Sequence, residues 1–201
     1  DIHDEVLFVM KRNDNVAKHI HLPAQSGNSR ILKKMNRTYT REWYEMKYNR
    51  IKEILPNCSV SCDIITGFCS ETEDDHKDTL ELLVNCPFEF SYMYYYSERP
   101  GTLAARKYED DIAEDIKKRR LSEVINVQHD IAKKLNRAQE GKVHRVLIEM
   151  QSKKNENEWM GRNEQNIKVI FPKDHYNLGD FVDVIIERST TTSLIGKGIT
   201  K

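Results

Sequence analysis

Hydrophobic positions along the first two-thirds of the chain alternate between helical spacing and short β-prone runs. Helical spacing is found at the start of the chain, over residues 29–36, from Thr40 to Leu55 and again after Thr72. The β-prone runs cover residues 18–23, 60–66 and 88–96. Because strands and helices follow each other in turn, the pattern predicts an α/β fold in which crossover helices connect parallel strands.

The pattern changes beyond a long charged helix, which we expect at residues 112–138 and which ends before Gly141. Short β-prone runs follow, separated by turn signals, at residues 143–150, 166–171 and 181–186. They predict a small all-β barrel of about sixty residues. We therefore place a domain boundary near Gln139, with an α/β domain over residues 1–139 and an all-β domain over residues 140–201.

Composition and charge narrow the choice of partners. The 201 residues include 32 basic and 32 acidic side chains, so the net charge is zero and only a local patch would bind nucleic acid. From residue 140 onward the two signs are also nearly balanced. No apolar run is long enough to span a membrane, and the first residues do not resemble a signal peptide. The four cysteines fit free thiols in a reducing cytosol, so we expect a cytoplasmic protein.

Three polar loops follow the three predicted parallel strands, at residues 21–27, 63–72 and 96–102. Because the carboxyl ends of parallel strands lie at one edge of a sheet, the Gln, Ser, Asp, Thr, Glu and Arg side chains of these loops should converge there. For any single loop the alternative is simple turn chemistry, with glycine for positive φ and Ser or Thr as helix caps. The convergence of all three loops favours a ligand site.

Motifs in these loops also occur, in the same order, in a known family. They are His19-Ile-His-Leu-Pro-Ala-Gln-Ser-Gly27, Lys34-Met-Asn-Arg37 with Tyr39-Thr-Arg41, Asp63-Ile-Ile-Thr-Gly67 with Glu71-Thr72, and Tyr96-Ser-Glu-Arg-Pro-Gly-Thr-Leu-Ala104. Their ordered set resembles the radical-SAM methylthiotransferases. In the β-rich part, the segments that resemble the TRAM domain of that family are Gly161-Arg-Asn-Glu-Gln-Asn166, Lys168 to Phe171, Gly179-Asp-Phe-Val-Asp-Val184 and Ser193-Leu-Ile-Gly196. The resemblance implies the C-terminal portion of a partial TIM-like radical-SAM barrel, followed by a small OB-like TRAM barrel.

The resemblance implies a transferase that adds a methylthio group to C2 of an isopentenyl-adenosine next to the tRNA anticodon. Such an enzyme uses S-adenosylmethionine and two 4Fe–4S clusters, and its partner is the anticodon stem-loop. Arg99-Pro100-Gly101 is similar to the tRNA-modifying branches, and residues 161–166 most resemble the isopentenyl-adenosine branch. The alternatives are a methylthiotransferase acting on threonylcarbamoyl-adenosine in tRNA or on a ribosomal protein, and a non-catalytic RNA-binding module.

The resemblance also points to individual ligand-binding residues. For S-adenosylmethionine it implies Gln25, Ser26, Asp63, Ile65, Gly67 and Glu71, although Asp63 fills a position that is usually glycine and the acid stands one residue late. A local basic cluster and polar residues of the β-domain are the expected RNA contacts: Lys33, Lys34, Arg37, Arg41, Arg162, Asn163 and Asn166. Arg99, in the third loop, is expected to orient the substrate.

Other notable residues have a simpler structural interpretation. The basic run Lys117–Arg120 is typical of a solvated helix face, and most of the alternating tyrosines Tyr92, Tyr94 and Tyr96 are expected to pack in the core. His19 and His21 face one side of a strand without an apparent third metal ligand, so we expect them to have structural roles.

The cysteines do not predict a metal site. Cys58 and Cys62 are separated by three residues, but no third cysteine follows two residues later, as the family motif Cys-x3-Cys-x2-Cys requires. The family's cluster-binding regions are not in this sequence. We therefore expect the chain alone to be inactive, to hold no cluster and to bind S-adenosylmethionine at most weakly. A strand edge left open at residues 19–22 also predicts self-association.

Overall fold

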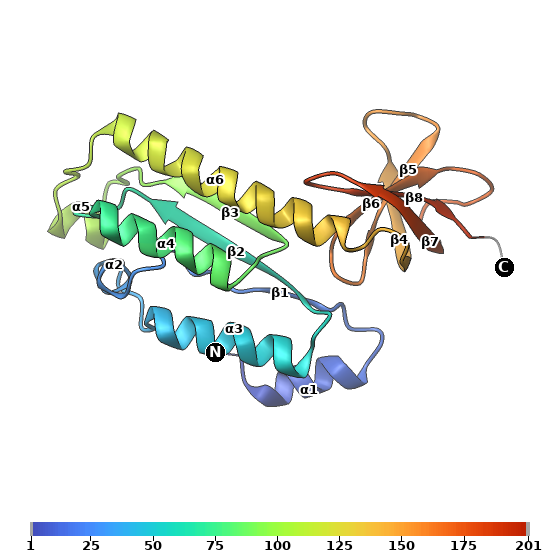
Figure 1. Ribbon diagram of the computed structural model, residues 1–201, viewed down its shortest axis with the longest axis horizontal. Helices are drawn as coiled ribbons and strands as arrows, with labels where there is room; N and C mark the ends of the chain where they lie inside the picture. The colour runs from blue at the N-terminus through green and yellow to red at the C-terminus, as the bar shows by residue number, and fades with distance from the viewer. Residues whose placement is uncertain (1, 200–201) are drawn as a thin grey trace. The chain divides into compact units, whose positions relative to one another are not determined.

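A computed structural model provides the structure of the chain and describes residues 2–199. The backbone divides into two compact units (Figure 1). The unit that we call the sheet unit comprises His21–Glu53 and Val60–Ile131, and the barrel unit comprises Asp1–Ile20, Ile54–Ser59 and Ala132–Lys201.

The sheet unit contains most of a three-stranded sheet. Its strands are β1 (His19–His21), β2 (Ser59–Thr66) and β3 (Phe90–Tyr95), in the spatial order β1-β2-β3. β2 and β3 run parallel, as the alternation of strands and helices predicts. The helices of this part are α2 (Ser29–Lys34), α3 (Arg41–Ile54), α4 (Glu73–Asn85), α5 (Leu103–Lys107) and α6 (Glu114–Arg137).

Side-chain caps set the starts of several of these helices. Asn28 accepts hydrogen bonds from the first backbone N–H groups of α2. Thr72 forms a capping box with Asp75 at the start of α4, where three acidic residues also complement the helix dipole. Thr102 caps α5, a short helix that we did not predict, because we expected only a polar loop at residues 96–102.

The two faces of the sheet differ in character. On one face, Cys62 accepts a hydrogen bond from Tyr44 of α3, and the Ser91 hydroxyl donates to Gln128 of α6 at 3.1 Å. On the other face, the side chains of Tyr92 and Tyr94 are exposed. Our expectation that these tyrosines pack mainly in the core is therefore wrong, because Tyr92 and Tyr94 are 49% and 56% exposed.

The basic run of α6 also departs from our expectation. Lys117 and Arg120 are buried, not solvated. Lys117 Nζ binds the carboxylate of Asp110. Arg120 binds the carboxylates of Glu71 and Glu73. Charge alone did not reveal this for Arg120, because its acidic partners Glu71 and Glu73 are distant in the sequence.

The barrel unit contains helix α1 (Asp4–Arg12) and a closed barrel of five strands, which Figure 1 draws in orange to red. The strands are β4 (Val143–Gln151), β5 (Glu158–Asn163), β6 (Lys168–Pro172), β7 (Phe181–Ser189) and β8 (Leu194–Gly198), and they close in the order β4-β5-β6-β8-β7. The barrel core is apolar: Val146, Ile148, Val169, Phe171, Val182, Val184, Ile186 and Leu194.

We expected a small all-β barrel but did not predict strands β5 and β8 individually. Each contains a glycine that weakens the β-pattern. A Cβ at Gly161 would lie 2.2 Å from the Leu147 carbonyl oxygen, and one at Gly196 would lie 2.0 Å from the Ile185 oxygen. The neighbouring strands thus leave no room for a side chain at either glycine. The same two glycines that weaken the β-pattern in the sequence therefore allow the barrel to close.

Acidification is expected to destabilise the barrel unit through His144, which is buried on β4. Burial lowers the pKa of His144 below its ordinary 6.5, and Lys142 adds to this effect. Because the unfolded chain then binds more protons, stability should be lost as the pH falls below about 6.5 and should not depend on this group above it. Denaturant midpoints of the protein and of His144→Gln, measured at about pH 8 and about pH 5, test this. An equal fall in both proteins would exclude His144 as the cause.

Candidate active site at the carboxyl ends of the strands

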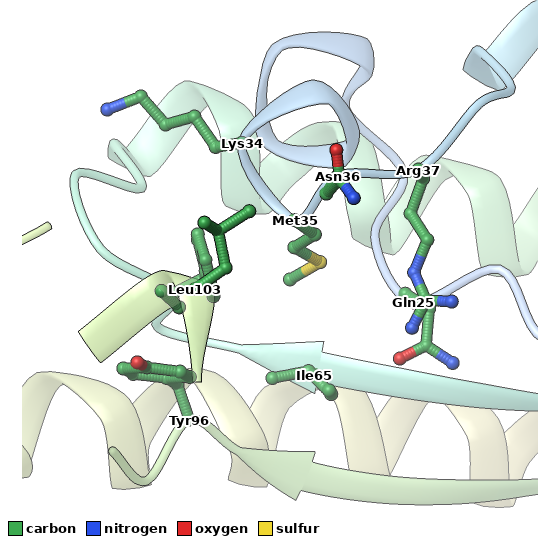
Figure 2. Close-up of a pocket in the computed structure, with 10 residues that line it drawn as sticks. Gln25, Lys34, Met35, Asn36, Arg37, Ile65, Tyr96 and Leu103 are labelled. Carbon is green, nitrogen blue, oxygen red and sulfur yellow. The ribbon is translucent and has the colours of Figure 1, made fainter. Parts of the chain in front are cut away.

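The loops that follow the three strands meet at a pocket of about 170 Å³ in the sheet unit (Figure 2). The pocket is lined by Gln25, Lys34, Met35, Asn36, Arg37, Ile65, Phe68, Tyr96, Leu103 and Ala104. Figure 2 shows Gln25 and Arg37 at one end, Tyr96 and Leu103 at the other, and Met35 above Ile65 between them. The pocket therefore combines an apolar interior with polar and basic groups at its margin.

Backbone hydrogen bonds to strand β2 hold Gln25 in place in this pocket. Its backbone N–H donates to the Asp63 carbonyl at 2.8 Å, and its own carbonyl accepts from the Ile65 N–H at 2.8 Å. Its φ of 70° is in the left-handed region, which is unfavourable for residues other than glycine. Such strain concentrates at functional sites, where the surroundings enforce it.

A buried carboxylate braces the turn after β2. Glu71 Oε2 accepts a hydrogen bond from the Gly67 N–H at 2.7 Å and from Arg120 at 2.9 Å. Burial raises the pKa of Glu71, whereas the Gly67 N–H and Arg120 act in the opposite direction. Gly67 has a φ of +67°, and a Cβ there would lie 2.4 Å from the Lys117 side chain. The Glu71 carboxylate, which Arg120 holds, and the side chain of Lys117 therefore both restrain this turn beside the pocket.

The third loop contributes the opposite wall of the pocket. The ring of Tyr96 packs edge-on against Phe68 with 4.8 Å between their centroids, and burial raises the pKa of Tyr96 to about 12. Leu103 and Ala104 come from α5, which the sequence analysis missed. The Thr102 cap before two alanines was the signal that could have revealed this helix. Arg99 is exposed and does not line the pocket.

The structure divides the residues expected to bind S-adenosylmethionine into two groups. Gln25 and Ile65 line the pocket, whereas Ser26, Asp63, Gly67 and Glu71 do not. Ser26 is buried, and its hydroxyl accepts from the Asn28 N–H at 3.2 Å, so it supports the first loop.

The basic residues of the sheet unit that were expected to bind RNA also differ in their positions relative to the pocket. Lys34 and Arg37 line the pocket, and Lys33 is exposed nearby on α2. Arg41 instead contacts three acidic side chains: Glu45, Asp78 and Glu81. A guanidinium with three carboxylate neighbours is less available to a phosphate, so Arg41 is the weakest RNA candidate of this group.

In the barrel unit, the expected RNA-binding loop is held together by its own side chains. Arg162 donates to the Asn166 carbonyl at 2.8 Å, and Asn163 is buried against His144 at 3.1 Å. Asn166 has a φ of 61°, which closes the turn. Sequence reasoning missed a second surface feature, the exposed ring of Phe181 with the Arg145 guanidinium 4.7 Å from its centroid.

The four cysteines are free and buried. Burial raises the pKa of Cys62 and of Cys86 to about 12, which disfavours the thiolate that metals bind. Within residues 2–199, no group of three or more His, Cys, Asp or Glu side chains is placed to hold a metal ion. Over the same residues, the structure contains no helix of the length and apolar character needed to cross a membrane.

Two family models match the chain in the order that the fold shows. Residues 1–83 match the radical SAM superfamily, and residues 137–199 match the TRAM domain. The solved structure of coproporphyrinogen III oxidase from Escherichia coli, a radical SAM enzyme, is similar to this structure. The similarity covers 100% of this chain and 49% of the oxidase chain, with a TM-score of 0.51 and 15% sequence identity. The fold expected from the sequence is thus confirmed: the last part of a radical-SAM barrel followed by a small β-barrel.

Curated relatives match the chain along its entire length. The tRNA-2-methylthio-N(6)-dimethylallyladenosine synthase of Amoebophilus asiaticus is 52% identical over 100% of this chain and 42% of its own length. The synthase of the same name from Flavobacterium psychrophilum is 49% identical over 99% of this chain and 41% of its own length. The chain thus spans less than half the length of these relatives. With both family models and these identities in agreement, the chain belongs to the radical-SAM tRNA methylthiotransferase family.

Proposed function

We propose that the full-length protein containing this chain is a tRNA methylthiotransferase that modifies C2 of an N6-dimethylallyl-adenosine beside the anticodon. The observation that carries the proposal is that synthases of that name are 52% and 49% identical to this chain over 100% and 99% of its length. The pocket at the strand ends supports it, because this is where parallel barrels bind their ligands.

The pocket residues fit part of an S-adenosylmethionine molecule. Ile65 and Met35 offer apolar surface to a purine ring, and Gln25 offers an amide to a ribose or to the methionine part. When bound, this cofactor would supply the radical and the methyl group, while the iron–sulfur chemistry belongs to segments that this chain does not contain. Glu71, Gly67 and Ser26 hold the loops in place, so their contribution is rigidity.

We also propose how the parts share the work of binding RNA. A boundary near Gln139 would separate the catalytic domain, residues 1–139, from the RNA-binding domain, residues 140–201. The TRAM match over residues 137–199 supports that division. Lys33, Lys34 and Arg37 would bind phosphates at the pocket mouth, and Arg162 with Asn166 would bind the same tRNA from the barrel. Arg99, on the exposed third loop, would orient the target nucleotide.

Removal of two basic residues at the pocket margin is expected to weaken RNA binding. In the full-length protein, Lys34→Ala/Arg37→Ala should lower affinity for the anticodon stem-loop and reduce the salt slope by about one unit for each lost phosphate contact. Lys77→Ala is the control, because it removes an exposed charge that is paired with Asp74 on α4. Binding isotherms at several salt concentrations make the comparison. An unchanged slope in the double variant would exclude these residues as phosphate contacts.

A further inference from the structure

One face of the sheet carries polar and aromatic side chains that the site described above does not use. We call this the open face, formed by His21 of β1, Ser61 and Asp63 of β2, and Phe90 and Tyr92 of β3. Asp63 stands opposite Tyr92 in the β2–β3 register, and Ser61 stands opposite Phe90. These side chains are therefore direct neighbours across the strands.

His21 is oriented by its contacts on this face. One ring nitrogen, Nδ1, lies 2.9 Å from the Ser61 hydroxyl, and Nε2 lies 3.5 Å from Asp63 Oδ1. The ring of Tyr92 stands edge-on to His21 at 6.1 Å and edge-on to Phe90 at 4.6 Å between centroids. The backbone carbonyl of Asp63 accepts from Gln25, so the strand that carries the carboxylate is tied to the pocket loop.

The chemistry of the open face fits a planar polar ligand better than another packed layer of protein. The side chains of His21 and Asp63 are 40% and 30% exposed, and covering them with apolar groups would leave a carboxylate poorly solvated. Exposed aromatic rings beside hydrogen-bonding groups are suited to a nucleobase, which needs both a stacking surface and polar partners at its edge.

The open face also leads directly into the pocket. Ile65 is two residues beyond Asp63 on the same face of β2, and it lines the pocket. A base lying over Asp63 and Tyr92 would thus be adjacent to a cofactor held by Gln25 and Ile65. Radical chemistry requires this kind of proximity between the cofactor and the carbon that it attacks.

We propose that the Asp63 carboxylate accepts a hydrogen bond from the N6–H of the target dimethylallyl-adenine, that Tyr92 contacts the ring, and that His21 positions Asp63. This assignment rests on the proposed function and deepens it. It also gives Asp63 a role different from the cofactor contact that the sequence motif implied, because the carboxylate projects onto the open face and not into the pocket lining. The competing occupant of this face is another segment of the full-length protein.

An atomic substitution in the RNA tests the contact. The full-length enzyme is assayed with a stem-loop carrying the natural nucleoside and with one in which oxygen replaces the N6 nitrogen, which removes the only donor at that position. The wild-type kcat/KM should be about 10–100-fold lower for the oxygen analogue, because the carboxylate loses its charged hydrogen bond. Asp63→Asn and Asp63→Ala should process both substrates at similar, low rates, and His21→Gln should discriminate less than the wild type.

Cleavage of S-adenosylmethionine without RNA provides the internal control. It is measured for each variant together with the denaturant unfolding midpoint, and the midpoint shows that the variant folds. If Asp63→Asn discriminates as strongly as the wild type, or loses cofactor cleavage while still folded, the proposal is overturned. If protein covers the face, Tyr92→Ala will lower the unfolding midpoint without altering KM, and this too contradicts the proposal. A wild-type enzyme that methylthiolates neither stem-loop would instead refute the proposed function itself.

Discussion

Replacing Arg120 with methionine should lower the free energy of unfolding by about 3–5 kcal/mol, the loss typical when one partner of a buried ion pair is removed. The side chains of Arg120 and Glu71 are only 4% and 1% exposed, so water cannot compensate the carboxylate that is left behind. Because Glu71 also holds the Gly67 N–H, the turn after β2 should loosen as well.

Arg119→Met is the matched control for this change. Arg119 is the next residue on α6 and also contacts two carboxylates, those of Glu73 and Glu123, but it is half-exposed. Surface ion pairs contribute little, so this variant should lose far less stability. Chemical denaturation of the two variants provides the comparison. Equal losses would show that the burial of Arg120 has no energetic consequence.

Gly27→Ala is expected to cost about 3 kcal/mol, at the upper end for overpacking, because the added methyl group meets backbone on α4. A Cβ at Gly27 would lie 2.4 Å from the Asp78 carbonyl oxygen and 2.5 Å from Thr79 Cα. Neither atom can move without displacing α4 or the first loop. The Gly27 N–H also donates to the Thr79 hydroxyl at 3.0 Å, so the displacement would be transmitted to Gln25 and the pocket.

Ser97→Ala, on the exposed third loop, serves as the control and should change stability by less than about 0.5 kcal/mol. Thermal or denaturant unfolding measures both variants, and S-adenosylmethionine binding to the full-length enzyme reports the state of the pocket. The prediction fails if Gly27→Ala unfolds at the wild-type midpoint and binds the cofactor normally.

Local sequence patterns were sufficient for the main elements of the sheet unit. Thr40 marked one helix start, Ser70 or Thr72 marked the next, where the structure has Thr72 as the cap, and the apolar run ending at Thr66 marked β2. Caps and periodicity act over a few residues, so they can be recognised locally. Strands β5 and β8 were missed because Gly161 and Gly196 are explained only by strands that approach them in the folded barrel. The burial of Arg120 depends likewise on distant Glu71.

The candidate site, like the fold, could be predicted from the sequence only in part. That the three loops converge follows from parallel strands, and Gln25 and Ile65 do line the pocket. Met35, Phe68 and Leu103 were not identified as lining residues, because apolar side chains give no sign in the sequence of which cavity they enter. The position of Asp63 opposite Tyr92 required the register of β2 and β3.

The most direct test of the account is a nucleoside analysis of tRNA treated with the full-length protein. The protein, with its clusters reconstituted anaerobically, is given S-adenosylmethionine, a reductant and tRNA that contains dimethylallyl-adenosine. We expect mass spectrometry to find this nucleoside heavier by one methylthio group in place of hydrogen, with 5′-deoxyadenosine formed alongside. Cofactor cleavage without a methylthiolated nucleoside, or methylthiolation of a different nucleoside, would contradict it.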